Sequence, residues 1–209
     1  MGEGIQTIGK SVRRTDRSAL HDTDSGMNRQ EAFRISQLES KIRNRKTEKG
    51  YVVGENGEVL AESIKSSRSA AKFYTRDLEA ARGGIMTHNH PNAEMGGSLA
   101  AQIGLPFSNA DLDNAVKYNL KEIRAVTPNY TYSIRRPKDG WGNQADIDRE
   151  LRNWERQVDS GYYEYMRRAT RNGLPENQAY DRANVGVQWS QWRKTAKALG
   201  WNITRKKNG

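Results

Sequence analysis

The stretch IMTHNHPN, residues 85–92, places a short apolar, β-prone run directly before His88 and His90. In a β-strand, residues i and i+2 point to the same face of the sheet. Two histidines at the end of a strand can therefore direct both imidazole rings at one point, and neutral imidazole is a good ligand for zinc and similar ions. The alternative is that His88 and His90 are polar surface residues of an ordinary turn.

The residues before this stretch combine strand and helix signals. Two β-prone runs, 51–53 and 58–64, flank Glu55-Asn56-Gly57, and an Asn-Gly pair between such runs is typical of a β-hairpin. A predicted helix follows, with Thr75 as its N-cap and Gly83-Gly84 as its stop. The run GIMTH then forms a short strand that leads into the histidines.

The residues after this stretch continue the alternation. A long connection, 92–107, precedes a helix for which Ser108 is the natural N-cap. The segment EIRAVTPNYTYSIRRP then predicts two strands around the Pro128-Asn129 turn. This order of elements predicts an α/β (α+β) fold rather than a helical bundle.

The alternating centre, residues 50–136, is flanked by regions of different character. Residues 1–30 are rich in Gly, Ser, Thr, Asp and Arg, which predicts a disordered or extended N-terminal arm. Apolar residues at near-helical spacing predict a helix within 31–49. Residues 137–209 are predicted to form a basic α-helical hairpin, with helices at about 144–171 and 174–199, followed by the basic tail TRKKNG.

The composition limits the classes of protein and site. Hydrophobic residues make up 34% of the 209 residues, and most of the net charge of +10 comes from the two flanks. Basic flanks indicate contacts with nucleic acid or an acidic protein, or else a solvated surface. The absence of cysteine excludes disulfides and thiolate metal sites. No apolar run approaches the roughly 18 residues of a membrane span, and no signal peptide is evident.

All five tryptophans lie in the C-terminal third of the chain, interleaved with Arg and Lys. Such residues either stack on nucleic-acid bases or pack in the core of a helical hairpin. The helical spacing of Trp154, Trp189 and Trp192 favours packing.

A third metal ligand beside the two histidines would have to be a carboxylate. A catalytic zinc site usually has three protein ligands and one open position. The chain has no cysteine, and its remaining histidine, His21, lies in the predicted N-terminal arm. Asp111, one turn into the helix that Ser108 begins, is the leading candidate. The same Ser-x-x-Asp spacing is close to a capping box, in which both side chains bond backbone N–H groups.

Read together, THNHP (87–91) and PFSNADL (106–112) resemble the signature of JAB/JAMM (MPN-type) metallopeptidases, His-x-His-Pro followed by Ser-x-x-Asp. The match is closest to the RadC-like branch. The segment EIRAVTPNYTYSI, residues 122–134, has a weaker likeness to metallopeptidase-like domains of phage head-morphogenesis and toxin-type proteins. The resemblance implies a JAMM/MPN-like core with a mixed β-sheet over 50–136. It also implies a Zn²⁺ site with His88, His90 and Asp111 as ligands.

The family also has a catalytic glutamate on an earlier strand, which accepts a proton from the attacking water. In GEVLAESI, residues 57–64, Glu62 matches this position best, and Glu58 is the alternative. By the same resemblance Ser108 would hold the oxyanion or orient the water. One departure from the family pattern is the connection 92–107, which is longer than usual.

The resemblance implies a zinc-dependent peptidase or isopeptidase that acts on a protein or peptide. The alternative is a non-catalytic protein, either a phage virion or head-associated component or a nucleic-acid-binding structural protein, that uses a JAMM-like scaffold with basic flanks as contacts. The expected location is the cytoplasm, or the virion if the chain is phage-derived.

Overall fold

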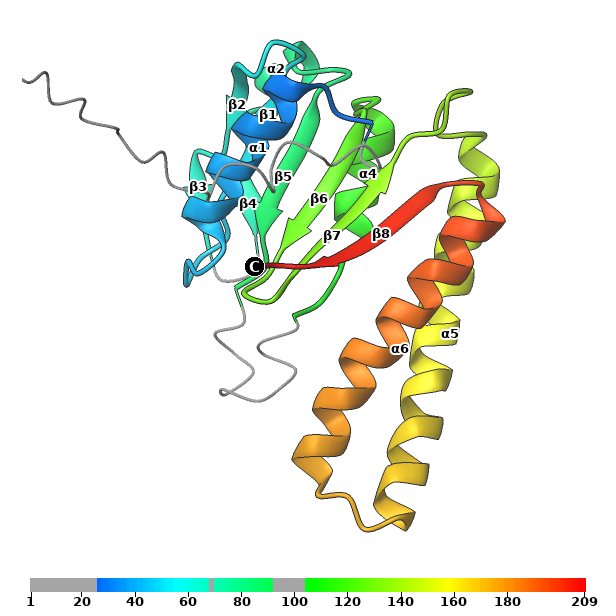
Figure 1. Cartoon of the computed structure of the whole chain (residues 1–209). Coiled ribbons are helices and arrows are strands. Elements are labelled where there is room, and N and C mark those ends of the chain that lie inside the picture. The colour runs from blue at the N-terminus through cyan, green and yellow to red at the C-terminus, as the bar shows by residue number, and fades with distance from the viewer. Residues whose placement is uncertain (1–25, 68–69, 92–103) are drawn as a thin grey trace, which may run out of the picture.

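The computed structural model describes residues 26–67, 70–91 and 104–209, which form a mixed α+β fold (Figure 1). Its main sheet has the strand order β2-β1-β5-β6-β7-β8, in which β5 and β6 are parallel and the other neighbours are antiparallel. These strands are β1 (Gly50–Val53), β2 (Val59–Glu62), β5 (Ile85–Asn89), β6 (Glu122–Val126), β7 (Tyr130–Arg135) and β8 (Asn202–Lys207). A second, two-stranded sheet pairs β3 (Lys65–Ser66) with β4 (Ala71–Lys72). The predicted fold class, the β1–β2 hairpin and the β6–β7 pair are therefore confirmed.

The helices cover both faces of the main sheet. They are α1 (Arg29–Ile42), α2 (Thr75–Ala80), α4 (Asn109–Lys117), α5 (Gln144–Arg171) and α6 (Glu176–Ala198). On one face, Ile35 and Leu38 of α1 pack against Ile85. On the opposite face, Leu112 of α4 packs against Met86 and the main core. The helices α5 and α6 form an antiparallel pair that extends away from the sheet (Figure 1).

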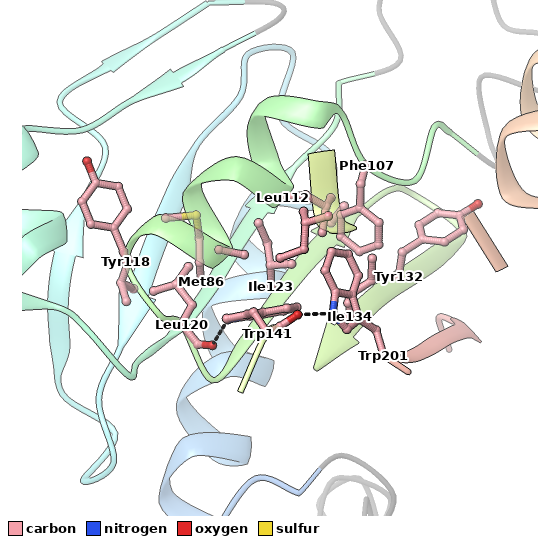
Figure 2. Packing of buried hydrophobic residues seen from close by; sticks show 14 of the residues in the cluster. Met86, Phe107, Leu112, Tyr118, Leu120, Ile123, Tyr132, Ile134, Trp141 and Trp201 are labelled. Atoms are coloured by element: carbon pink, nitrogen blue, oxygen red, sulfur yellow. Dashed lines mark hydrogen bonds between the residues drawn. The ribbon is translucent and has the colours of Figure 1, made fainter. Parts of the chain in front are cut away.

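Buried tryptophans connect the C-terminal region to the core on the α4 face (Figure 2). The indole N–H of Trp141 donates to the carbonyl of Leu120 at 3.0 Å, and that of Trp201 donates to the carbonyl of Trp141 at 2.9 Å. Trp192 is fully buried, and its N–H donates to the carbonyl of Phe107 at 3.1 Å.

The other two tryptophans pack against this core from α5 and α6. The ring of Trp154 stacks on Trp192 with centroids 4.6 Å apart, and Trp189 lies 5.3 Å from the ring of Tyr132. The packing interpretation of the tryptophans is thus confirmed.

A buried ion network ties α1 to the two parallel strands. Glu39 of α1 accepts hydrogen bonds from Thr87 Oγ1 of β5 at 3.1 Å and from Arg124 Nε of β6 at 2.6 Å. Arg124 also pairs with Glu122 at 2.6 Å. Because each of these charges is buried, a well-paired arrangement is needed to offset the cost of removing it from water.

The predicted basic tail is wrong, because residues 202–207 form the edge strand β8. The ladder with β7 runs from Tyr130 opposite Lys207 to Arg135 opposite Asn202. Ile203, the strand's one apolar residue, lies opposite Ile134, so β8 has too weak a hydrophobic pattern to be recognised in isolation. The C-terminal region is therefore joined to the main sheet.

Helices α1 and α2 differ from the predictions at their boundaries. Helix α1 begins earlier, because Asn28 and Glu31 form a capping box in which each side chain accepts from the other's backbone N–H. It ends at Ile42, since the following residues offer no apolar side chain to extend the buried face. Thr75 is the first residue of α2 rather than its N-cap, and Tyr74 occupies the cap position without a side-chain hydrogen bond.

Residues 1–25, most of the predicted N-terminal arm, lie outside the described residues. Within the described ranges, every helix is too short or too polar to cross a lipid bilayer.

Replacement of Trp192 tests how much stability this packing contributes. Since Trp192 is fully buried and hydrogen-bonded, we expect Trp192→Ala to lower the free energy of unfolding by about 3–5 kcal/mol. Urea unfolding measures the change. Tyr163→Ala, at a position that is 72% exposed on α5, is the control and should cost under about 0.5 kcal/mol. Equal losses in the two variants would contradict the packing described here.

Candidate metal centre

The main sheet positions the two histidines. His88 lies in β5, between Gly50 of β1 and Ala125 of β6, and it points to the same face as Met86. His90 directly follows the strand, where its N–H donates to the carbonyl of Val126 at 3.0 Å. The Nε2 atoms of the two rings lie 2.8 Å apart, so both imidazoles are directed at one point.

The third member of the cluster is Asp111, in the first turn of α4. Its Oδ1 lies 3.2 Å from Nε2 of His88, and its Oδ2 lies 3.6 Å from Nε2 of His90. Oδ2 also accepts hydrogen bonds from the backbone N–H and the hydroxyl of Ser108, at 2.7 Å and 2.8 Å. The two interpretations of Asp111 are therefore compatible, because one carboxylate completes the capping box and also faces both imidazoles.

The donor set fits a divalent cation such as zinc. One ligand atom from each of His88, His90 and Asp111 lies within 4.8 Å of the other two. Nδ1 of His90 is 2.9 Å from the carbonyl oxygen of Leu105, and since a carbonyl only accepts, this nitrogen carries the proton. The lone pair of a neutral His90 is then on Nε2, the atom that faces the cluster, as in many metal-ligating histidines.

The close approach of the three groups shifts the pKa values of Asp111 and His90. Burial alone would raise the pKa of Asp111, but the charges and hydrogen bonds of His88 and His90 hold it well below its ordinary value. Burial alone would lower the pKa of His90, but the hydrogen bond and charge of Asp111 raise it above its ordinary value of 6.5. Protons and a bound cation would compete for these atoms, so the affinity for the cation should decrease as the pH is lowered.

The structure does not bring Glu62 or Glu58 to this cluster. Glu62 lies opposite Tyr51 in the ladder, and Tyr51 lies opposite Thr87, so Glu62 points to the face away from His88. Its side chain is 55% exposed, and its Oε1 pairs with Nζ of Lys49 at 2.6 Å. Glu58 lies in the β1–β2 turn, where its carboxylate accepts from the N–H of Asn56.

A different glutamate, Glu48, lies beside the cluster. It precedes Gly50 by two residues, and Gly50 is paired with His88, so Glu48 lies on the same face as His88. Burial raises the pKa of Glu48 above its ordinary value of 4.5, while the charges of His90 and His88 act in the opposite direction. The sequence signal for Glu48 is its place two positions before a strand, which is informative only once that strand is known to pair with β5.

Asn89, between the two histidines, holds the segment that carries Glu48. Its side chain points to the α1 face and accepts from the N–H of Lys49 at 2.7 Å. Its amide N–H groups face the carbonyls of Thr47 and Arg45 at 3.2 Å and 3.4 Å. The histidine segment therefore fixes the position of Glu48 through its middle residue.

The cluster opens into a cavity of about 540 Å³. Glu48, His88, His90, Ser108 and Asp111 all contribute to its lining. A partly buried carboxylate, a group of side chains that could hold a cation and a hydroxyl therefore line the same cavity.

No protein-family model, curated protein or solved structure matches this chain. The JAMM resemblance therefore depends on the two motifs and on the geometry of the residues they contain.

In the metal-free protein, the raised pKa of His90 links stability to pH. A group whose pKa is raised by folding stabilises the native state fully below its unfolded value, about 6.5, and loses this contribution as the pH rises through the folded value. In the presence of a chelator, we expect the free energy of unfolding to fall as the pH rises above about 6.5, and to fall less in His90→Gln. Asp111 adds no slope here, because its lowered pKa keeps it ionised.

Urea unfolding at a series of pH values measures this slope. Asp113→Asn, at an exposed position on the same helix, is the matched control and should keep the wild-type slope. A His90→Gln slope equal to that of wild type would show that the His90–Asp111 pair does not behave as described.

Proposed function

We propose that this chain is a metal-dependent hydrolase of amide bonds, a peptidase or isopeptidase of JAMM type. The observation that carries the proposal is the convergence of His88, His90 and Asp111, with Glu48 in the lining of the same cavity. The motif order of the JAMM family supports the same assignment.

The three ligands proposed for Zn²⁺ are His88, His90 and Asp111. Two imidazole nitrogens and one carboxylate are a ligand set that catalytic zinc sites use, with one coordination position left open. The chemistry that Zn²⁺ supplies when bound is Lewis acidity, which acidifies water and polarises a carbonyl group.

We assign the role of general base to Glu48 instead of Glu62. Glu48 lies on the ligand face and lines the cavity, whereas Glu62 lies on the opposite face in an ion pair with Lys49. As base, the Glu48 carboxylate accepts a proton from the attacking water and passes it to the leaving nitrogen. Its raised pKa suits this role. A group that first accepts a proton and then donates it works best when its pKa lies near the working pH.

Ser108 acts chiefly through Asp111. Its hydroxyl and backbone N–H both donate to Asp111 Oδ2, which fixes the orientation of the ligand carboxylate. Since the Ser108 hydroxyl already donates its proton to Asp111, the main role of Ser108 is to position this ligand rather than to contact a substrate oxygen.

Metal analysis tests the proposed ligand set. We expect about one zinc per chain after equilibration with zinc and removal of the excess, because three protein ligands are in place. The double variant His88→Ala/His90→Ala should retain no zinc while keeping its far-UV circular dichroism. Absence of zinc in the wild-type protein would rule out the proposed function.

Two glutamine variants test the general base. Glu48→Gln should lower the rate of hydrolysis by about 10²- to 10⁴-fold and retain zinc, because the carboxylate transfers protons without binding the ion. The assay is cleavage of a quenched fluorescent peptide library by zinc-loaded protein.

Glu62→Gln is the matched control, because it makes the same chemical change on the opposite face of the sheet. It should retain both zinc and activity. If Glu62→Gln removes activity and Glu48→Gln does not, the assignment of the base is incorrect.

A further inference from the structure

The helices α5 and α6 contribute to the cavity that contains the ligand cluster. Trp154 of α5 and Gln188 of α6 line it, together with Asn109 at the start of α4. Asn109 also donates a hydrogen bond to Glu155 of α5, and this bond joins α4 to α5 next to the cavity. The region beyond residue 137 therefore forms part of the wall around the proposed site.

Much of the remaining wall is apolar. Phe73, Met86, Leu105 and Phe107 are among the residues that line the cavity. A Cβ atom added at Gly50 would lie 2.8 Å from Cζ of Phe73 and 3.3 Å from Cβ of His88. Glycine thus allows the Phe73 ring to lie directly beside His88, and the apolar wall begins next to the ligands.

Trp154 is held rigidly in this wall. It is half-buried and stacks on Trp192, whose N–H is bonded to the carbonyl of Phe107. Phe107 in turn contacts Trp192 edge to face and precedes the Ser108–Asp111 capping box. An aromatic surface that is fixed before binding loses little entropy when a ligand packs on it.

The charges in the cavity favour a peptide over a nucleic acid. Glu48 and Asp111 are acidic, and the described residues that line the cavity include no Lys or Arg to neutralise a phosphate. The side-chain amides of Asn109, Asn114 and Gln188 can donate to and accept from a peptide backbone. An apolar lining with a few polar groups is the common composition of a ligand pocket, and about 540 Å³ lies within the usual range.

We infer that the wall formed by Phe73 and Trp154, which are only partly buried, binds a large apolar side chain of a peptide, adjacent to the amide held at the ligand cluster. The helices α5 and α6 therefore select substrates. This inference depends on the proposed function for the identity of the bond, but the binding of the side chain does not require hydrolysis.

The test uses full-length Glu48→Gln protein, loaded with zinc, so that peptides bind without turnover. The probes are N-acetylated hexapeptide amides that differ only at one central position, which is Phe, Leu, Ala or Asp. Calorimetric titration should rank Phe and Leu above Ala and Asp, with at least about tenfold tighter binding of the Phe peptide than of the Ala peptide. Equal affinities for the four peptides would overturn the inference.

Four further variants, made in the same Glu48→Gln background, locate the preference for the Phe peptide. Trp154→Leu should reduce the preference for the Phe peptide over the Ala peptide to under about threefold, because the flat ring is lost. Trp154→Phe should largely keep this preference, because it retains an aromatic ring. Gln188→Trp, which adds bulk without removing a packed side chain, should weaken the Phe peptide more than the Ala peptide, and it serves as the test if Trp154→Leu does not fold. Tyr163→Leu, distant on α5, is the control and should leave the ranking unchanged.

The remaining outcomes separate this inference from the proposed function. A preference for Phe that depends on Trp154, in a chain that cleaves no peptide of the library, supports the side-chain site and contradicts the peptidase. Cleavage with no influence of Trp154 or Gln188 supports the peptidase and contradicts the side-chain site. Displacement of the Phe peptide by a single-stranded oligonucleotide would indicate base stacking on Trp154 instead.

Discussion

The alternation of side chains along β5 determines what each face of the sheet can do. All five residues of this strand are buried, and it pairs with β1 on one side and β6 on the other. Met86 and His88 consequently face α4, while Thr87 and Asn89 face α1. A register shift of one residue would exchange the two sets, and His88 would then lie among the buried ions around Glu39. The ligand cluster, the support of the Glu48 segment and the attachment of α1 all depend on this one register.

The two faces use buried charge in different ways. On the α1 face, Glu39 has Thr87 and Arg124 as partners, which join α1 to the two parallel strands. On the α4 face, His88, His90 and Asp111 have mainly one another, and two imidazole nitrogens 2.8 Å apart need a proton or a cation between them. In the first arrangement, oppositely charged protein side chains pair with one another. A proton or cation between the two imidazoles would stabilise the second arrangement further. This dependence on an added positive charge is typical of a binding site rather than of a structural ion pair.

Local sequence signals were sufficient for the elements whose pattern is local. The Asn-Gly turn, the strand before His88 and the cap at Ser108 each depend on a few adjacent residues, so the hairpin, β5, α4 and the grouping of the two histidines with Asp111 could be predicted. The position of Glu48 could not, because it depends on the pairing of β1 with β5 across a separation of 38 residues from Gly50 to His88. Strand β8 was missed for a similar reason. Its residues are mostly exposed and charged and show no apolar–polar alternation, so only the pairing with β7 identifies it as a strand.

The strands β7 and β8 are neighbours in the sheet, yet the chain between them contains both α5 and α6. This pair of helices is therefore inserted at what would otherwise be the turn of a simple hairpin. Loop-closure entropy changes slowly with the length of an insertion, so helices of another length could be accommodated between the same two strands. The residues that would carry out the chemistry lie on elements before this insertion. Under the proposed function, the segment that would set substrate preference and the residues that would carry out the reaction therefore lie in separable parts of the chain.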